Sequence, residues 1–379
     1  MQALRGIRVA DFSHVVAGPL ATHFLALNGA EVTKIEPPGG DPLRNYTQTP
    51  AERGMAPAFQ GINAGKDSVT LDLKTPQGRE RAEAIIAGAD VVVENFRPGV
   101  MARLGLGAAA MRAKYPRLIW CGISGFGQTG PLADVAAMDQ IVQSLSGMML
   151  VSGLPDDPPL RVGFPLVDTF TGLLAAFAIQ TALLQRERGL VQGQEIDVAM
   201  LDAALVMMLS VVNPLLATGE EPVRTGSRGF SRAPTSDTFA CLGDAITLGA
   251  VEDDKVAKTL AVLGLSGLLA DPRFASRSAR ARNADALAAL MAPVLATRPA
   301  AAWEAAFRAV GVPAARVQSP SQALAMPHLA ARDLFLTLPN GQRILNAGFR
   351  LAQGGPGTDR AAPVLGSAIH ATLWEEETR

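Results

Sequence analysis

Asp168 is the carboxylate in this chain whose surroundings most favour covalent chemistry. It lies between a Gly163-Phe164-Pro165 turn and an apolar segment, Thr169 to Gln185, whose hydrophobic residues recur at helical spacing. A carboxylate at a helix start can cap the free N–H groups there, which is the commonest role of such an aspartate. It can also attack an activated acyl group and form a covalent intermediate. The two roles are compatible, because a helix start favours the ionised carboxylate.

The segments before Asp168 alternate between predicted strands and predicted helices. Apolar runs bounded by turn signals predict strands over 7–11, 31–36, 68–71, 90–94 and 117–123, with helices such as 19–27 and 75–87 between them. This alternation predicts an α/β fold with a mostly parallel sheet covered on both faces. Ligands bind such sheets at the carboxyl ends of strands, so the loops after these strands are where a site is expected.

The first strand–helix–strand unit resembles a dinucleotide site, because the acidic Glu36 ends its second strand. The loop 13–18 contains only one glycine, Gly18, where a G-x-G-x-x-G fingerprint is required. We therefore do not expect NAD or FAD.

The pattern changes after about residue 220. A polar loop is followed by a hairpin signal at Gly243-Asp244 and by alanine-rich helical segments. These features predict a smaller α+β domain over 225–330. The large domain is then expected over 1–224, with 331–379 returning to it.

Composition narrows the class of protein. The chain has 379 residues, 48% of them hydrophobic, and its 34 basic and 35 acidic residues nearly balance. This favours a globular enzyme and disfavours nucleic-acid and membrane-surface partners. No stretch approaches about 18 uninterrupted apolar residues, and the start lacks the pattern of a signal peptide. Cys121, Cys241 and the histidines have no metal or redox spacing, so we expect no metal and a cytoplasmic location.

Several separated stretches together resemble one family. They are VADFSHVVAGP, GAEVTKIEPPGGD, INAGKDSVTLDLKTPQG, ADVVVENFRPG, GFPLVDTFTG and GQEIDVAMLDA, followed by GVPAARV and PVLG. In their order and spacing the chain resembles the family III CoA-transferases, which include formyl-CoA transferase, the carnitine CoA-transferase and α-methylacyl-CoA racemase. The resemblance covers nearly the whole chain.

The resemblance implies a Rossmann-like large domain joined to a small domain, in an interlocked homodimer. It also implies that Asp168 attacks an acyl-CoA to form a mixed anhydride, which the CoA thiolate converts into an aspartyl-CoA thioester. An acceptor acid then reverses these steps. Coenzyme A would thus enter as an acyl-CoA substrate, and a carboxylic acid would be the second substrate.

The family's contacts to CoA fall on eight residues of this chain. Lys74 and Arg103 can pair with phosphate oxygens, and Asn95 lies just beyond a predicted strand, where a ligand is expected. The eight residues are Val15, Val16, Leu71, Lys74, Asn95, Phe96, Arg97 and Arg103.

Two alternatives to a CoA-transferase stay open. The first is a racemase or epimerase of 2-methylacyl-CoA, a branch that uses a histidine immediately before an aspartate. This chain has Met138 before Asp139, and a thioether cannot carry a proton. The second is a CoA-binding protein without catalysis, against which the intact Asp168 argues.

The chain departs from formyl-CoA transferase at three positions. Val16 stands in place of a glutamine, Pro37 in place of an arginine, and Ala136 in place of the lysine of a Lys-x-Tyr segment. These changes remove polar contacts and argue against formyl and oxalyl groups as the transferred pair. The sequence leaves the donor and acceptor acids open.

Overall fold

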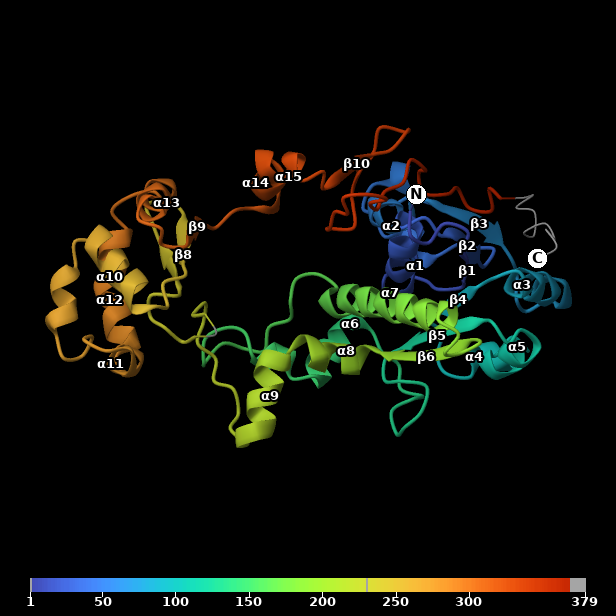
Figure 1. Cartoon of the computed structure of the whole chain (residues 1–379), viewed down its shortest axis with the longest axis horizontal. Helices are drawn as coiled ribbons and strands as arrows, with labels where there is room; N and C mark the ends of the chain where they lie inside the picture. The colour runs from blue at the N-terminus through green and yellow to red at the C-terminus, as the bar shows by residue number, and fades with distance from the viewer. Residues whose placement is uncertain (1, 230, 369–379) are drawn as a thin grey trace. The chain divides into compact units, whose positions relative to one another are not determined.

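The computed structural model describes residues 2–229 and 231–368 (Figure 1). Their contacts divide the chain into two compact units. One consists of Leu150–Leu160 and Glu221–Met326, and the other contains the rest of the described chain. Residues 150–160 had been predicted to belong to the large domain. They join the smaller unit, in which Gly226 N donates a hydrogen bond to Gly153 O at 3.0 Å.

The segment after Met326 lies against the first unit. Gly357 N donates to Leu27 O at 2.7 Å, and Arg44 Nη2 donates to Pro363 O at 3.1 Å. The predicted segment 331–379 extends beyond this, but residues 369–379 lie outside the described part of the chain.

A six-stranded, entirely parallel sheet forms the centre of the first unit. Its strand order is β3-β2-β1-β4-β5-β6, the order of a doubly wound Rossmann-like fold. Successive side chains of a strand alternate between the two faces, and both faces are apolar: Val91 and Val93 pack into one core, and Val92 packs into the other. The strands are β1 Arg8–Asp11, β2 Glu31–Glu36, β3 Lys66–Thr70, β4 Val91–Glu94, β5 Ile119–Ser124 and β6 Gln194–Ala199.

Helices cover both faces of the sheet (Figure 1). The helices α1 and α7 pack together on one face, and α3 and α5 pack on the other. The α1–α7 approach is close because Gly172 has no side chain: a Cβ there would lie 2.6 Å from the carbonyl oxygen of Ala17. The bounds are α1 Ala17–Leu27, α3 Pro76–Ala87, α4 Val100–Arg103, α5 Ala108–Lys114, α7 Leu166–Glu187, α8 Met200–Met207 and α9 Leu209–Thr218.

Several boundaries differ from the sequence-based expectation. The helix predicted from Thr169 begins at Leu166. Residues 37–65, for which no helix or strand was predicted, contain the short helix α2 Pro57–Asn63, which starts at a proline. The helix α6 Asp139–Leu145 was not predicted, because its seven residues are too few to show a clear apolar period.

The second unit has its own core. Three short antiparallel strands, in the order β7-β8-β9, pack against helices through residues such as Ile246, Met291, Trp303 and Phe307. Its elements are β7 Thr238–Ala240, β8 Ala245–Leu248, α10 Asp253–Val262, α11 Arg277–Arg282, α12 Ala284–Leu295, α13 Ala300–Ala309, β9 Ala314–Arg316 and α14 Pro320–Leu324. In the first unit, α15 Pro327–Ala331 precedes the hairpin of β10 Phe335–Thr337 and β11 Arg343–Leu345.

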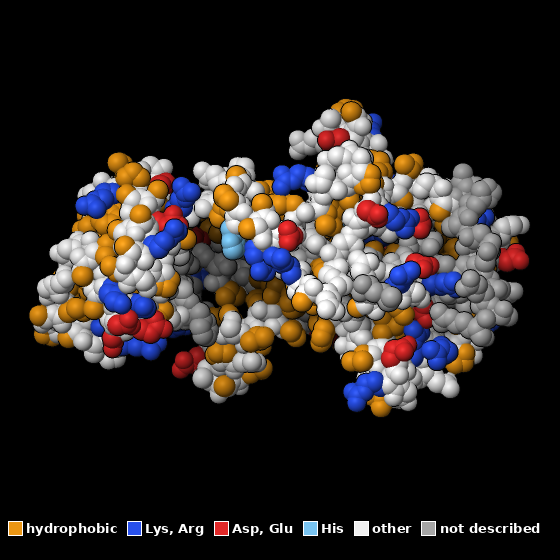
Figure 2. Space-filling model, turned by 45° about the horizontal axis from the view of Figure 1, so that its top comes forward, with side chains coloured by type: hydrophobic (Ala, Val, Ile, Leu, Met, Phe, Trp, Pro, Cys, Tyr) orange, Lys and Arg blue, Asp and Glu red, His pale blue; other side chains and the backbone are white. Residues whose placement is uncertain are grey.

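Helix α7 exposes an apolar stripe. Leu173, Phe177 and Leu184 recur on one side of the helix and are 50%, 67% and 58% exposed. By length and composition alone this 22-residue helix could cross a membrane, although 44% of its most apolar window is buried within the protein. Figure 2 shows that hydrophobic side chains also lie among the charged ones elsewhere on the surface.

Candidate active site

Two loops meet at the carboxyl ends of the central strands of the sheet. Strands β1 and β4 are neighbours in the sheet, and the chain order reverses between them. The loops that follow them flank the crevice in which open α/β sheets bind ligands. They are tied together, because Asn95 Oδ1 accepts from His14 N and Asn95 Nδ2 donates to His14 O, both at 2.8 Å. The Phe96 ring lies edge-on to the His14 imidazole, with 5.3 Å between ring centroids.

A cavity of about 600 Å³ lies beside these loops, and Asp168 forms part of its wall. The fold thus brings Asp168 together with five of the eight residues that the resemblance assigned to CoA. Those five are Val15, Val16, Asn95, Phe96 and Arg97.

A second cavity, of about 420 Å³, contains two more of the eight, Leu71 and Lys74. His14 and Phe96 line both cavities, so the two spaces adjoin at these rings. Arg103 is the exception. It lies exposed in α4 and lines neither cavity, although the neighbouring Leu104 lines the second.

Asp168 is the third residue of α7 and does not cap it. The N-cap is Pro165, which has no capping side chain. The cap comes instead from another helix: Asp139 Oδ2 accepts a hydrogen bond from Asp168 N at 3.0 Å. Gln143 holds Asp139 in place, because its Nε2 donates to Asp139 Oδ1 at 2.6 Å while its Oε1 accepts from Val162 N at 2.9 Å. The start of α7 is therefore fixed by a carboxylate of α6.

The ionisation of Asp168 differs from the sequence-based expectation. Burial, and secondly the nearby carboxylate of Asp139, raises the pKa of Asp168 to about 7. The helix start had been expected to favour the ionised form. The fold opposes it, because the side chain is largely shielded from water and the carboxylate of Asp139, which accepts the hydrogen bond from Asp168 N, lies nearby. Asp168 therefore titrates near neutral pH.

The loop after β1 rests on two fully buried ion pairs. Lys66 Nζ lies 3.1 Å from Asp11 Oδ2, and Lys34 Nζ lies 3.0 Å from Asp41 Oδ2. Lys34 Nζ also donates to Ser13 O at 2.7 Å. Burial alone would raise the pKa of Asp11, but Lys66 and Lys34 outweigh it and hold that pKa well below its usual range.

Val15 has a strained backbone. Its φ is +66°, in the left-handed region that β-branched residues rarely occupy. The carboxylate of Asp41 accepts from Val15 N, with 3.1 and 3.2 Å to its two oxygens. A buried carboxylate, itself paired with Lys34, thus holds a strained residue at the cavity wall. Strain of this kind is typical of functional sites.

Glu36 is unavailable to a dinucleotide. Its two carboxylate oxygens accept from Arg44 Nε and Nη2, each at 2.7 Å, and Oε1 also accepts from Ser68 Oγ at 2.6 Å. Glu36 therefore fixes the loop after β2 instead of binding a ribose.

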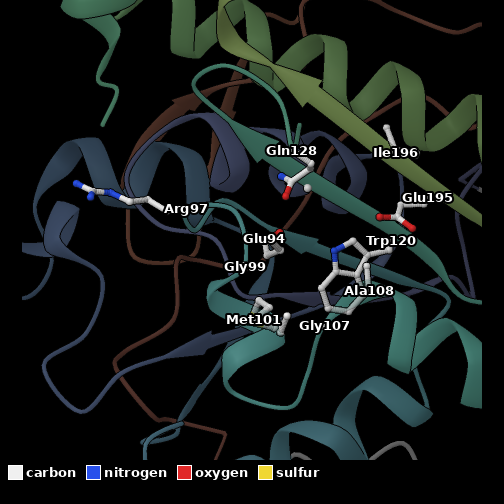
Figure 3. A pocket seen from close by; sticks show the side chains of 12 residues that line it. Glu94, Arg97, Gly99, Met101, Gly107, Ala108, Trp120, Gln128, Glu195 and Ile196 are labelled. Atoms are coloured by element: carbon white, nitrogen blue, oxygen red, sulfur yellow. The ribbon is translucent and has the colours of Figure 1, made fainter. Parts of the chain in front are cut away.

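A third, smaller cavity of about 170 Å³ contains Glu94, Trp120 and Gln128 (Figure 3). Burial raises the pKa of the Glu94 carboxyl to about 7. Arg97 also contributes to the lining, but its side chain points away from the other labelled residues in Figure 3. Among the sequence-predicted site residues only Arg97 lines this space.

Sequence reasoning missed three residues that shape the site: Asp139, Lys34 and Asp41. Asp139 lies 29 positions before Asp168 with no local motif linking them. Asp41 follows the glycine pair of the PPGGD stretch, which was noted for the resemblance alone. Across the described residues no group of three or more His, Cys, Asp or Glu side chains is arranged to hold a metal ion.

Comparison with known proteins gives consistent results. The sequence pattern of CoA-transferase family III matches residues 4–368. The chain is 38% identical to an acetyl-CoA:oxalate CoA-transferase of Acetobacter aceti, over 87% of this chain and 85% of that protein. It is 33% identical to a succinate–glutarate CoA-transferase of Agrobacterium fabrum, over 99% and 96% respectively.

A crystal structure of a CAIB/BAIF family protein from Brucella suis has a TM-score of 0.89 and 34% identity, and the match covers 98% of this chain and 99% of that one. CoA-transferases take CoA thioesters as substrates, and this protein is an enzyme that moves CoA between an acyl-CoA and a carboxylic acid. The chain belongs to CoA-transferase family III.

Proposed function

We propose that CoA transfer in this enzyme proceeds through covalent intermediates on Asp168. The observation that carries the proposal is the position of this carboxylate: it lines the cavity at the reversal point of the sheet, beside five of the residues assigned to CoA. The hydrogen bond from Asp168 N to Asp139 fixes its backbone. Positioning of a nucleophile against a bound thioester is the main requirement for such chemistry.

The proposed steps of CoA transfer require no oxidant or reductant. A carboxylate oxygen of Asp168 attacks the thioester carbonyl carbon, the C–S bond breaks, and a mixed anhydride and CoA thiolate result. The thiolate then attacks the aspartyl carbonyl of the anhydride, which releases the donor acid and leaves an aspartyl-CoA thioester. The acceptor carboxylate attacks this thioester and expels the thiolate. The thiolate finally attacks the acceptor carbonyl, and the Asp168 carboxylate is restored.

The site supports an extended placement of CoA. The rings of His14 and Phe96 border both large cavities, so one elongated ligand can pass between them. We place the nucleotide end beside Leu71 and Lys74, and the thioester end beside Asp168. Together the two cavities have the volume of a cofactor site. Val15, Val16, Asn95, Phe96 and Arg97 would line the path of the pantetheine arm and the phosphates.

Substitution of Asp168 tests the covalent route. Asp168→Asn keeps the size of the side chain but removes the nucleophilic oxygen pair, so transfer should fall by at least about a thousandfold while the variant stays folded. Wild-type enzyme incubated with acyl-CoA and then treated with hydroxylamine should carry a hydroxamate on the peptide containing Asp168. An active Asn variant, together with an unlabelled peptide in the wild type, would refute the mechanism.

A matched pair of cations tests the placement of CoA. Lys74 lines the second cavity and Arg103 does not, although the sequence had assigned both to phosphate. Lys74→Ala should raise the KM for acyl-CoA about tenfold, because a charge-assisted contact contributes about 1.5–3 kcal/mol. Arg103→Ala is the control and should leave the KM within about twofold. The reverse result would move the phosphates toward α4.

We also propose that the protein is a homodimer. The exposed stripe of Leu173, Phe177 and Leu184 on α7 supports a partner surface, and the resemblance implies that the partner is a second, interlocked copy. Sedimentation at micromolar concentration should give a dimer, and Phe177→Glu should weaken it. A monomeric, fully active wild type would contradict this. The cytoplasmic location and the absence of membrane and nucleic-acid partners stay predictions, which cell fractionation would test.

A further inference from the structure

The loop after β4 lies between two cavities of the first unit. Asn95, Phe96 and Arg97 line the cavity of about 600 Å³ that also contains Asp168. Arg97 and Glu94 line the smaller cavity of about 170 Å³. On the side of the smaller cavity the loop therefore faces open space instead of closely packed side chains. Because packing on that side is incomplete, hydrogen bonds have to fix the position of the loop.

Two side chains supply these hydrogen bonds. On the side of the loop after β1, Asn95 exchanges two hydrogen bonds of 2.8 Å with the backbone of His14. On the other side, Glu94 Oε2 accepts from Phe96 N, also at 2.8 Å. The ring of Phe96 lines both large cavities and lies edge-on to the His14 imidazole. Glu94 thus fixes the backbone that carries this ring.

The surroundings of Glu94 fix its carboxyl group in turn. The residue is 6% exposed, and Gly122 of β5 lies opposite it in the sheet. A Cβ on Gly122 would lie 3.2 Å from Glu94 Oε1, so the glycine leaves room for the carboxyl group. The ring nitrogen of Trp120 and the side chain of Gln128 point toward Glu94 (Figure 3). The carboxyl group therefore has little freedom to turn away from Phe96 N.

Glu94 acts on the loop as a hydrogen-bond acceptor and not as a counter-ion. Burial, and to a smaller extent Asp197, raises the pKa of Glu94 to about 7, although the hydrogen bonds from Phe96 N and Trp120 act against this rise. Much of the carboxyl is therefore uncharged at neutral pH. Arg97 lines the same cavity, but its side chain points away from Glu94 (Figure 3). An uncharged acceptor of the same length should serve equally well.

We propose that Glu94 is a positioning residue: by accepting from Phe96 N it holds the loop 95–97 in the conformation that binds CoA, and so sets the affinity for the CoA part of every thioester. Glu94 does not line the cavity of Asp168, so it acts through the loop without touching the substrate. The proposal rests on the proposed placement of CoA beside this loop. It is independent of the covalent role of Asp168 and of which acids are exchanged.

Calorimetric titration with CoA itself tests the proposal, because CoA alone gives no turnover. Glu94→Leu removes the acceptor and should raise the Kd for CoA about tenfold, the effect of one lost hydrogen bond. Glu94→Gln keeps an acceptor oxygen and should leave the Kd within about twofold. An unchanged Kd in Glu94→Leu, or equal weakening by Leu and Gln, would overturn the proposal.

Glu195→Leu is the matched control. Glu195 lines the same small cavity, but it pairs with Arg112 of α5 at 3.0 Å and has no hydrogen bond to the loop among the described residues. The same substitution there should leave the Kd for CoA unchanged. Equal weakening by the two Leu variants would mean that the cavity as a whole is disturbed, which also overturns the role of Glu94.

A general loss of folding is separated from a loss of positioning. Unfolded protein lowers the number of CoA molecules bound per chain in the titration, whereas a displaced loop raises the Kd. Hydrogen exchange of the peptide containing Phe96 should be faster in Glu94→Leu than in wild type and Glu94→Gln. Glu94→Met, which also lacks an acceptor oxygen, replaces the Leu variant if that variant does not fold. Equal exchange in all variants would overturn the proposal.

The placement of CoA and the role of Glu94 fail in different ways. If Phe96→Ala weakens CoA binding but Glu94→Leu does not, CoA lies beside the loop and only the positioning role is wrong. If Phe96→Ala leaves the Kd unchanged, the placement of CoA is wrong and the role of Glu94 falls with it. Neither result bears on the hydroxamate test of Asp168.

Discussion

Two regions with buried carboxylates border the same cavity, and they are built in opposite ways. Under the loop after β1, Asp11 and Asp41 are each paired with a lysine, and all four side chains are fully buried. At the start of α7, Asp168 has a second carboxylate, Asp139, as its charged neighbour. The first arrangement lowers the pKa of Asp11 and the second raises that of Asp168. The ion pairs fix the loop after β1, whereas the charged group that acts on Asp168 is another carboxylate.

The largest effect is expected from removing one partner of the buried ion pair between Asp11 and Lys66. Asp11→Asn leaves Lys66 buried without its counter-ion and should reduce the free energy of unfolding by about 3–5 kcal/mol. The double variant Asp11→Asn/Lys66→Met should recover much of this loss, because the remaining charge is gone. Urea denaturation at pH 7 measures both. A single variant within about 1 kcal/mol of wild type would show that the pair is not a structural one.

The ion pair between Asp11 and Lys66 also predicts that the protein loses stability at low pH. Asp11 has a folded-state pKa below its ordinary value of 3.8, so its contribution to stability is present above that pH and is lost as the pH falls below it. Stability of the wild type should therefore fall steeply below about pH 4, a limb that Asp11→Asn should lack.

Asp168→Asn should increase the free energy of unfolding, whereas Asp11→Asn should decrease it. The folded protein raises the pKa of Asp168 from 3.8 to about 7, so it binds a proton that the unfolded chain releases between these values. Ionisation therefore costs stability as the pH rises. The Asn variant should be more stable than wild type by about 1–2 kcal/mol at pH 8, with the difference shrinking toward pH 4. A destabilised Asn variant at pH 8 would contradict the comparison.

Asp139→Asn should shift the pH profile. The Asn side chain can still accept from Asp168 N, but its charge is gone, so the pKa of Asp168 should fall. In wild type, transfer should decline as the pH drops below about 7, the pKa of Asp168, because the proposed nucleophile must be ionised. In the variant this acid limb should move to lower pH by roughly one unit. Gln143→Leu, which removes the side chain that holds Asp139, should instead lower kcat without that shift.

The smallest effect is expected at Val15. Its left-handed backbone costs about 1–2 kcal/mol for a residue other than glycine. Val15→Gly should relieve that strain, offset in part by the entropy of glycine, for a net gain of up to about 1 kcal/mol. Val15→Ala, which keeps a Cβ, should show no gain. Equal stabilities of the Gly and Ala variants would mean that the strain has no energetic weight.

Local signals in the sequence were enough for most of the sheet. Val91–Glu94 and Glu31–Glu36 are apolar runs with turn residues at their ends, and both form strands. Thr75-Pro76 marks the start of α3, and Thr75 Oγ1 accepts from Gly78 N at 3.0 Å. Periodicity missed α2 and α6, whose seven residues each give too short a pattern.

The resemblance selected residues that lie together in the fold, but the sequence did not reveal their electrostatics; the roles of these residues stay predictions. Motif resemblance selected Asp168, Asn95 and Phe96, which the fold places around one cavity. The pairing of Asp139 with Asp168 N joins two helix starts that are distant in sequence, so no local pattern reveals it. Arg103 lies exposed in α4 and lines neither of the two larger cavities, which its charge alone does not indicate.

The glycine contact between α1 and α7 limits how this site can be altered. Gly172 brings the backbone of α7 against Ala17, which itself lines the cavity, so the distance between the loop after β1 and Asp168 is set by two helices in direct contact. The contact between α1 and α7 keeps this distance fixed. Any side chain at position 172 would push the two helices apart and move Asp168 away from the loop after β1.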